Sequence, residues 1–138
     1  MGKRFDSLVF PGGKSRAFTL SYDDGVVQDR RLAEIFRKRG LKCTFNIGSG
    51  LFGHKDGGNF PGRPPLDLSK LSAEEAKTVY AGHEIAGHGL FHSDLSGVGT
   101  PLAMFEVIED KRRLEELTRK PLKMFAYPFG THNADTRE

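Results

Sequence analysis

The strongest constraint on the fold is a regular alternation of strand-like and helix-like segments. Four short segments have the composition and alternation of strands: 17–22, 42–47, 84–86 and 124–127. Three segments between them have apolar residues at helical spacing or helix-capping signals: 28–39, 72–80 and 100–118. Neighbouring parallel strands need a long crossover between them, and a helix supplies it. The sequence therefore predicts an α/β fold with about four parallel strands.

Local signals set the expected boundaries of these elements. Ser72 followed by Glu75 predicts a capping box at the start of the second helix. Thr100 is expected as the N-cap of the third helix, with Pro101 at its first position. The apolar positions of that helix are Leu102, Phe105, Ile108 and Leu117. Residues 48–65 are rich in glycine and proline, so we expect a long functional loop there rather than an element.

The composition fits one globular domain over residues 1–138. The hydrophobic content is 37%, and the single cysteine, Cys43, excludes an internal disulfide and a cysteine-based zinc site. The formal charge is +3, with acidic and basic residues intermixed. Glu109 and Arg113, for example, stand at i,i+4 and favour a solvated helix face.

The same features argue against two classes of partner. Basic residues form no dense block interleaved with aromatics, so nucleic acid is not an expected partner. The chain also lacks the run of about 20 apolar residues that a membrane span needs and the apolar core of a secretory signal. We therefore expect no membrane partner and a cytoplasmic location.

Asp23 and Asp24 stand at the end of the first expected strand. In parallel α/β folds, functional groups gather at the carboxyl ends of the strands. Adjacent side chains there point in different directions, so one carboxylate can bind a metal while the other faces water or substrate. Turn chemistry alone offers a simpler interpretation, in which Asp-Asp-Gly is only a turn that leads into a helix.

His88 and His92 follow the third expected strand. Their spacing of four places both imidazoles on one side of a helical turn. Together with Asp24 they make a three-ligand set that leaves positions open for water and substrate. Zinc is the default metal, and cobalt, nickel or manganese also suit these ligands. Two histidines at this spacing also occur by chance, and His83 is expected to have a structural role.

Three motifs carry a resemblance to a known family. Residues 20–25 (LSYDDG) resemble the first motif of the polysaccharide deacetylases, carbohydrate esterases that include chitin and peptidoglycan N-deacetylases. Residues 82–95 (GHEIAGHGLFHSDL) resemble the second motif, and residues 125–130 (FAYPFG) resemble the third. Residues 43–45 (CTF) match the family's second strand, so the resemblance covers about residues 17–130.

The resemblance implies a deformed β/α barrel, of which this chain holds the N-terminal part. It implies a hydrolase that removes N-acetyl or O-acetyl groups from a sugar or polysaccharide. The metal ligands that the resemblance implies are Asp24, His88 and His92. Asp23 is the implied base that takes a proton from the attacking water, and the backbone N–H of Phe129 is the implied oxyanion donor. Tyr127 and Pro128 are the implied substrate contacts.

The sequence departs from the family pattern in two places. Ala126 stands where the family usually has an arginine that orients the catalytic aspartate. The chain ends at Glu138, before the family's later acidic and aromatic motif and the histidine that protonates the leaving amine. We therefore expect a C-terminally truncated domain or a tight homo-oligomer. His132 is a possible substitute acid.

Two alternative functions stay open on the sequence alone. One is a non-catalytic module that binds metal or glycan and is left over from this fold. The other is hydrolysis of a C–N bond in a small amide that is not a sugar.

Overall fold

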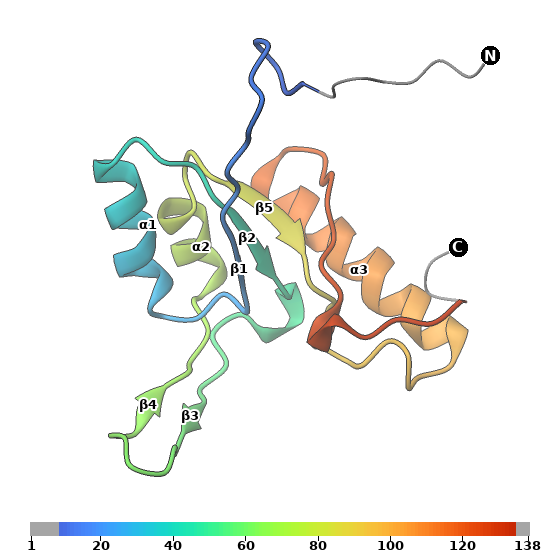
Figure 1. Ribbon diagram of the computed structural model, residues 1–138. Helices are drawn as coiled ribbons and strands as arrows, with labels where there is room; N and C mark the ends of the chain where they lie inside the picture. Colours follow the sequence, from blue (N-terminus) through green and yellow to red (C-terminus); the bar gives the residue numbers. More distant parts are fainter. Residues whose placement is uncertain (1–8, 135–138) are drawn as a thin grey trace, which may run out of the picture.

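Three parallel strands form the centre of the molecule, whose computed structural model describes residues 9–134 (Figure 1). Strand β1 (Ser21–Asp23) pairs with β2 (Thr44–Ile47), and β2 pairs with β5 (Glu84–Gly87). In this register Asp23 lies opposite Asn46, and Asn46 lies opposite Ala86. The pairing confirms the predicted α/β class. It also brings the carboxyl ends of the three strands to one edge of the sheet.

Strand β2 divides its side chains between the two faces of the sheet. Phe45 and Ile47 are almost completely buried and belong to the hydrophobic core. Thr44 and Asn46 alternate with them, so they lie on the opposite face, where both make side-chain hydrogen bonds. One face of the sheet is therefore apolar and packed, and the other carries polar groups.

Three helices pack against the apolar face. They are α1 (Asp29–Lys38), α2 (Ala73–Val79) and α3 (Thr100–Thr118), close to the three predicted helices. All three contribute to one cluster of buried residues: Ala33, Phe36, Cys43, Phe45, Ile47, Leu71, Ala76, Tyr80 and Leu114. Packing of helices on an apolar sheet face removes both surfaces from water, which is the main stabilisation of such a layer.

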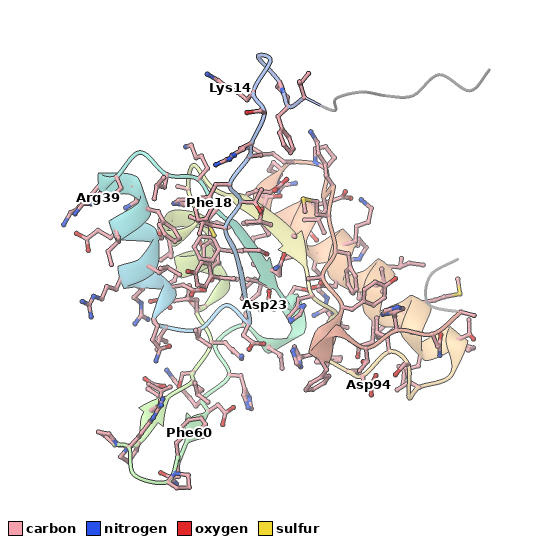
Figure 2. All side chains as sticks on the ribbon, viewed as in Figure 1. Lys14, Phe18, Asp23, Arg39, Phe60 and Asp94 are labelled. Carbon is pink, nitrogen blue, oxygen red and sulfur yellow. The ribbon has the colours of Figure 1, made fainter. Side chains whose placement is uncertain are left out.

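The predicted strands at 17–22 and 124–127 depart most from the sequence-based expectation. Residues 17–20 precede β1 without belonging to it, because β2 begins only at Thr44, opposite Ser21. Phe18 is accordingly 81% exposed, and Figure 2 shows it ahead of β1. The predicted strand at 124–127 makes only a single parallel bridge, between Phe125 and Gly87. Since β5 ends at Gly87, the rest of that segment has no strand beside it there.

The expected loop at 48–65 does contain elements, so that prediction was wrong. A 3-10 turn, η1 (Ser49–Leu51), follows β2 directly. Further on, β3 (Gly57–Gly58) pairs antiparallel with β4 (Leu66–Asp67) in a small hairpin that projects from the sheet and includes Phe60 (Figures 1 and 2). Strands of two residues are too short to leave a periodic pattern in the sequence.

Helix α3 presents a different face to the protein than the sequence indicates. Its buried residues are Ala103, Glu106, Asp110 and Leu114. The predicted apolar positions Leu102, Phe105 and Ile108 are about half exposed instead, at 48–58%. Gly99, and not Thr100, is its N-cap. Two carboxylates thus lie on the buried face of a helix that also has an exposed apolar face.

No helix among the described residues is both long enough and apolar enough to cross a membrane.

The capping box predicted at α2 is present. The Ser72 hydroxyl accepts a hydrogen bond from the Glu75 N–H, and the Glu75 carboxylate accepts one from the Ser72 N–H. Loss of the cap leaves a helical N–H without a partner. We expect Ser72→Ala to lower the free energy of unfolding by about 1 kcal/mol in urea titrations. Ser72→Asp keeps an acceptor and should stay close to wild type; equal losses in both variants would contradict the capping role.

Asp29 is a buried carboxyl that joins α1 to α2. It is 3% exposed, and its Oδ2 accepts a 2.6 Å hydrogen bond from the Tyr80 hydroxyl. Burial raises the pKa of Asp29 from an ordinary 3.8 to about 6, although the Tyr80 hydrogen bond acts in the opposite direction. The folded protein therefore holds this proton more tightly than the unfolded chain does.

This proton makes the stability depend on pH. Below about pH 4 the carboxyl is protonated in both states, and its contribution to stability is fully present. As pH rises through the folded pKa of about 6, folding has to bury a charge and that contribution is lost. Asp29→Asn cannot ionise, so its unfolding free energy should fall less than that of wild type between about pH 4 and 7. Parallel curves for the two proteins would contradict the buried proton.

Candidate metal centre

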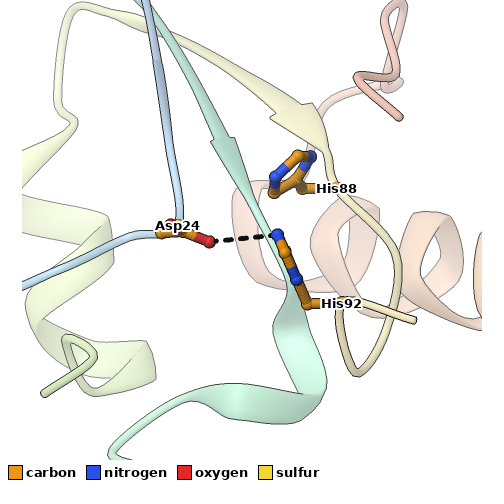
Figure 3. Close-up of side chains that lie close together, drawn as sticks. All are labelled: Asp24, His88 and His92. Carbon is orange, nitrogen blue, oxygen red and sulfur yellow. Dashed lines mark ion pairs between the residues drawn. The ribbon is translucent and has the colours of Figure 1, made fainter. Parts of the chain in front are cut away.

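Three side chains from two loops converge where the strands end. Asp24 follows β1, and His88 and His92 follow β5. One ligand atom from each residue lies within 4.8 Å of the other two. Figure 3 shows the carboxylate of Asp24 facing the two imidazoles from the opposite side. The structure therefore brings together the three residues that the sequence predicted as metal ligands.

Asp24 is held in an uncommon backbone conformation. Its φ is +79°, and its N–H donates to the carbonyl of Asn46 on the neighbouring strand. Its Oδ1 lies 3.3 Å from His92 Nε2 and 3.6 Å from Lys70 Nζ. Residues with positive φ cost energy unless the surroundings hold them, and they gather at functional sites. His92 and Phe129 share this conformation, so three of the four such non-glycine residues described here lie at this site.

The environment of His88 fixes which ring nitrogen faces the site. The residue is 2% exposed, and its Nδ1 lies 2.9 Å from the carbonyl oxygen of Ala126. A carbonyl oxygen can only accept, so Nδ1 carries the hydrogen, and Nε2 keeps its lone pair for a ligand. Histidine ligands of metals are commonly oriented in this way.

His92 lies on a loop, and the predicted helical turn is absent from this described segment. The chain reverses through Gly89 at φ +78° and His92 at φ +59°, and the two imidazole centroids lie 4.8 Å apart. The two histidines, four residues apart, are therefore brought together by a tight loop and not by a helix. Burial lowers the pKa of His92, while the Asp24 carboxylate opposes this effect. The ring is therefore neutral at neutral pH, as a metal ligand must be.

These residues fit a divalent cation. One carboxylate and two neutral imidazoles are the ligand set of open catalytic sites, and the donor atoms already converge. The side chain of Asp24 is 43% exposed and that of His92 is 23% exposed, so water and substrate can reach the site. The arrangement does not select one metal, because zinc, cobalt, nickel and manganese all accept such ligands.

Asn46 orients Asp23, and the sequence analysis missed it. The Asn46 Nδ2 donates to Asp23 Oδ1 at 2.6 Å and to Ser21 Oγ at 2.7 Å. The two residues are strand neighbours, so the parallel register sets this contact. The available signal was a polar residue, Asn46, between the apolar Phe45 and Ile47. This chain has Ala126 where an arginine was expected, and the buried amide of Asn46 holds the predicted base instead.

The third motif lies beside the histidines. Phe129 is 69% exposed, and its ring contacts His92 edge-on with centroids 4.6 Å apart. Pro128 is buried, which favours a role in holding the loop. Tyr127 contacts Phe125 and His132 through its ring. The oxyanion role of the Phe129 N–H and the substrate contacts of Tyr127 and Pro128 stay predictions.

His83 lies at the beginning of β5, away from the cluster. Its ring packs edge-on against Phe45 and Phe36, at centroid distances of 5.5 and 6.3 Å. Burial lowers its pKa. This placement agrees with the structural role expected for it. Lys70 is a second residue that the sequence analysis missed; with 13% of its side chain exposed, it sets a positive charge beside Asp24.

Comparison with known families agrees with these observations. The polysaccharide deacetylase profile matches residues 11–138, which is most of the chain. The chain belongs to the polysaccharide deacetylase family. This confirms the resemblance carried by the three motifs, whose residues meet at the candidate site. A search among curated protein sequences found no significant match.

Solved structures related to this family share the fold. The Streptococcus pyogenes deacetylase PplD in complex with acetate aligns with a TM-score of 0.75 and 22% identity, over 92% of this chain and 51% of its own. IcaB from Ammonifex degensii aligns with a TM-score of 0.68 and 19% identity, over 86% and 53%. BA3943, a CE4 family pseudoenzyme from Bacillus anthracis, aligns with a TM-score of 0.62 and 19% identity, over 86% and 38%.

This chain therefore spans about half the length of the first two proteins and less of the third. At these identities the likeness establishes the fold alone. It confirms the predicted N-terminal part of the deformed β/α barrel of the polysaccharide deacetylases.

The ligand assignment can be tested by metal content. We expect the purified protein, after incubation with zinc and desalting, to hold about one zinc by mass spectrometry. Asp24→Ala and His92→Ala each remove one of three ligands and should lose most of it. His54→Ala is a matched control, since that exposed histidine lies outside the cluster. Retention of zinc in both ligand variants would refute the assignment.

Proposed function

We propose that this protein is a metal-dependent hydrolase that removes acetyl groups from a sugar or polysaccharide, acting on N-acetyl or O-acetyl groups. One observation carries the proposal. An open cluster of Asp24, His88 and His92 lies beside a second carboxylate, Asp23, that a buried amide holds in place. Membership in the polysaccharide deacetylase family supports the class of substrate.

In this proposal Asp24, His88 and His92 hold a divalent cation, with zinc as the first metal to test. When bound, the cation supplies Lewis acidity that polarises an acetyl carbonyl and makes water more acidic. His88 contributes Nε2, because its Nδ1 is engaged by the Ala126 carbonyl. His92 contributes Nε2, the atom that already faces Asp24.

Asp23 acts as the general base. It precedes a ligand directly in the chain, is exposed to solvent, and accepts a hydrogen bond from Asn46. A base needs a defined position more than it needs burial, because proton transfer depends first on geometry. Asn46 donates to only one carboxylate oxygen, Oδ1, so Oδ2 is the oxygen proposed to take the proton from the attacking water.

The surroundings of the site suit a sugar. Phe91, which precedes His92 in the chain, is 51% exposed. Phe129, whose ring contacts His92, is 69% exposed. Aromatic rings with an exposed face offer an apolar surface for the C–H face of a pyranose ring. The backbone N–H of Phe129 is the proposed donor to the oxyanion that forms as water adds to the carbonyl.

A non-catalytic binding module is the second candidate, and specific observations favour it. One of the similar structures is named a CE4 family pseudoenzyme. In addition, position 126 is alanine and so has no side chain that reaches Asp23. Such a module would bind metal and glycan through the same residues without releasing acetate.

Hydrolysis of two acetyl substrates separates these functions. An aryl acetate tests the metal and base alone, because its phenolate leaves without a proton. Oligomers of N-acetylglucosamine also require protonation of the amine. We expect zinc-dependent acetate release from the aryl ester. Asp23→Asn should lower its rate by about 10²–10⁴-fold while zinc stays bound, because the general base is lost.

Asn46→Ala should cause a smaller loss, up to about 100-fold, because it misplaces the base without removing it. Thr44→Ala is the matched control, on the same strand and face but hydrogen-bonded to Glu84. Full activity of Asp23→Asn would remove Asp23 from the base role. Zinc and glycan binding without release of acetate from either substrate would favour the binding module.

A further inference from the structure

Helix α3 carries two buried carboxylates that the proposed chemistry does not use. Asp110 is 0% exposed and Glu106 is 2% exposed, and they stand one helical turn apart. A buried carboxylate is costly unless hydrogen bonds or charges compensate it. Apolar residues at these two positions of the helix would avoid that cost. The hydrogen-bond partners of the two carboxylates therefore indicate their role.

Their partners belong to the loops of the candidate metal site. Asp110 Oδ2 accepts from the N–H of His88 at 3.1 Å, and Oδ1 accepts from the N–H of Ser49 at 2.7 Å. Glu106 Oε2 accepts from the N–H of Phe91 at 2.8 Å, and Oε1 accepts from the hydroxyl of Ser93 at 2.8 Å. Besides Ser49 in η1, the bonded groups are thus one proposed histidine ligand, His88, and both chain neighbours of the other, His92.

The same loop is tied to the protein at Leu90 as well. Its N–H donates to the backbone carbonyl of Glu106 at 3.2 Å, and its carbonyl accepts from the N–H of Gly50 at 2.9 Å. Helix α3 and η1 therefore hold the loop from two sides. This support is needed because His92 has φ +59°, a conformation that a free loop would leave.

Glycines make this close packing possible. A Cβ at Gly48 would lie 2.4 Å from the Gly89 carbonyl oxygen, and one at Gly50 would lie 2.5 Å from the Leu90 carbonyl oxygen. A Cβ at Gly87 would lie 3.2 Å from Asp110 Oδ2. Side chains at the first two positions are sterically excluded, and one at Gly87 would crowd the carboxylate. The backbone is thus shaped to let the loop, η1 and α3 approach one another.

We infer that Glu106 and Asp110 are positioning residues for the metal site, which hold the loop 88–93 so that its two imidazoles converge on Asp24. The inference rests on the proposed function, since it assigns a role toward the proposed cation. Neither carboxylate binds the cation. Together they act through three backbone N–H groups and one hydroxyl, and so set the distance between the metal-binding atoms that strand pairing alone leaves open.

Amide variants test this role with little change in volume. Glu106→Gln and Asp110→Asn each replace one accepting oxygen with an NH₂ group, which cannot accept from an N–H. We expect zinc affinity, measured by competition with a chromogenic chelator, to fall about 10–100-fold in each variant. The absorption spectrum of the Co²⁺ form should change as well, because the ligand geometry changes. Urea titration of the metal-free proteins measures stability separately.

Glu109→Gln is the matched control on the same helix. Its carboxylate binds Arg112 and Arg113 at the surface, so zinc affinity and the Co²⁺ spectrum should match wild type. Where a buried variant fails to fold, Ser93→Ala tests the same link from the loop, since it removes only the hydrogen bond to Glu106 Oε1. A several-fold loss of zinc affinity is expected there.

The outcomes are distinguishable. Wild-type protein that binds neither Zn²⁺ nor Co²⁺ overturns the proposed metal site, and the inference with it. Wild type that binds both, with Glu106→Gln, Asp110→Asn and Ser93→Ala variants that bind equally well and give the same Co²⁺ spectrum, overturns the positioning role alone. Loss of affinity with an altered spectrum, and with the Glu109→Gln control unchanged, supports it.

Discussion

Parallel hydrogen bonding of β1, β2 and β5 is the constraint on which the rest of the candidate site depends. The register puts Asp23 beside Asn46, and the next residue, Asp24, donates to the Asn46 carbonyl. Parallel pairing also makes the loops after β1 and β5 begin at the same edge. Asp24 and His88 therefore lie close together although they are 64 positions apart in the chain. The strand pairing brings their loops together.

The two faces of the sheet have different roles. Phe45 and Ile47 bury the apolar face under three helices, and this burial supplies most of the stabilisation. Asn46 uses the opposite face to hold Asp23. Because side chains of one strand alternate between faces, a four-residue strand performs both tasks. Asp23 and the amide that holds it thus lie on rigid strands, which suits chemistry that depends on position.

Several features of the candidate site are unfavourable alone and are stabilised by the structure around them. Asp24, His92 and Phe129 adopt positive φ, and Glu106 and Asp110 bury carboxylates. Each of these features is unfavourable alone. They persist because a packed core next to them over-determines the geometry, and because their polar atoms are satisfied by the loops. Such local exceptions to sequence rules are expected where function is placed.

Local signals in the sequence predicted much of this arrangement. Ser72 and Glu75 predicted a capping box because both partners lie within one turn. The candidate metal ligands could be named from the sequence because their residue types and motif spacing are visible in the chain. Asn46 was missed because its contact with Asp23 joins two strands. Glu106 and Asp110 were missed because charged residues in a helix favour a solvated face.

The sequence by itself determined the α/β class, the order of the three main strands and three helices, and the identity of Asp23, Asp24, His88 and His92 as the residues of interest. These follow from periodicity, capping and motif, which are all local. The tertiary structure decided which face of α3 is buried, how far the strand at 124–127 pairs, and how a loop brings His92 to Asp24. Those results depend on contacts between distant segments, whose energies the order of residues does not display.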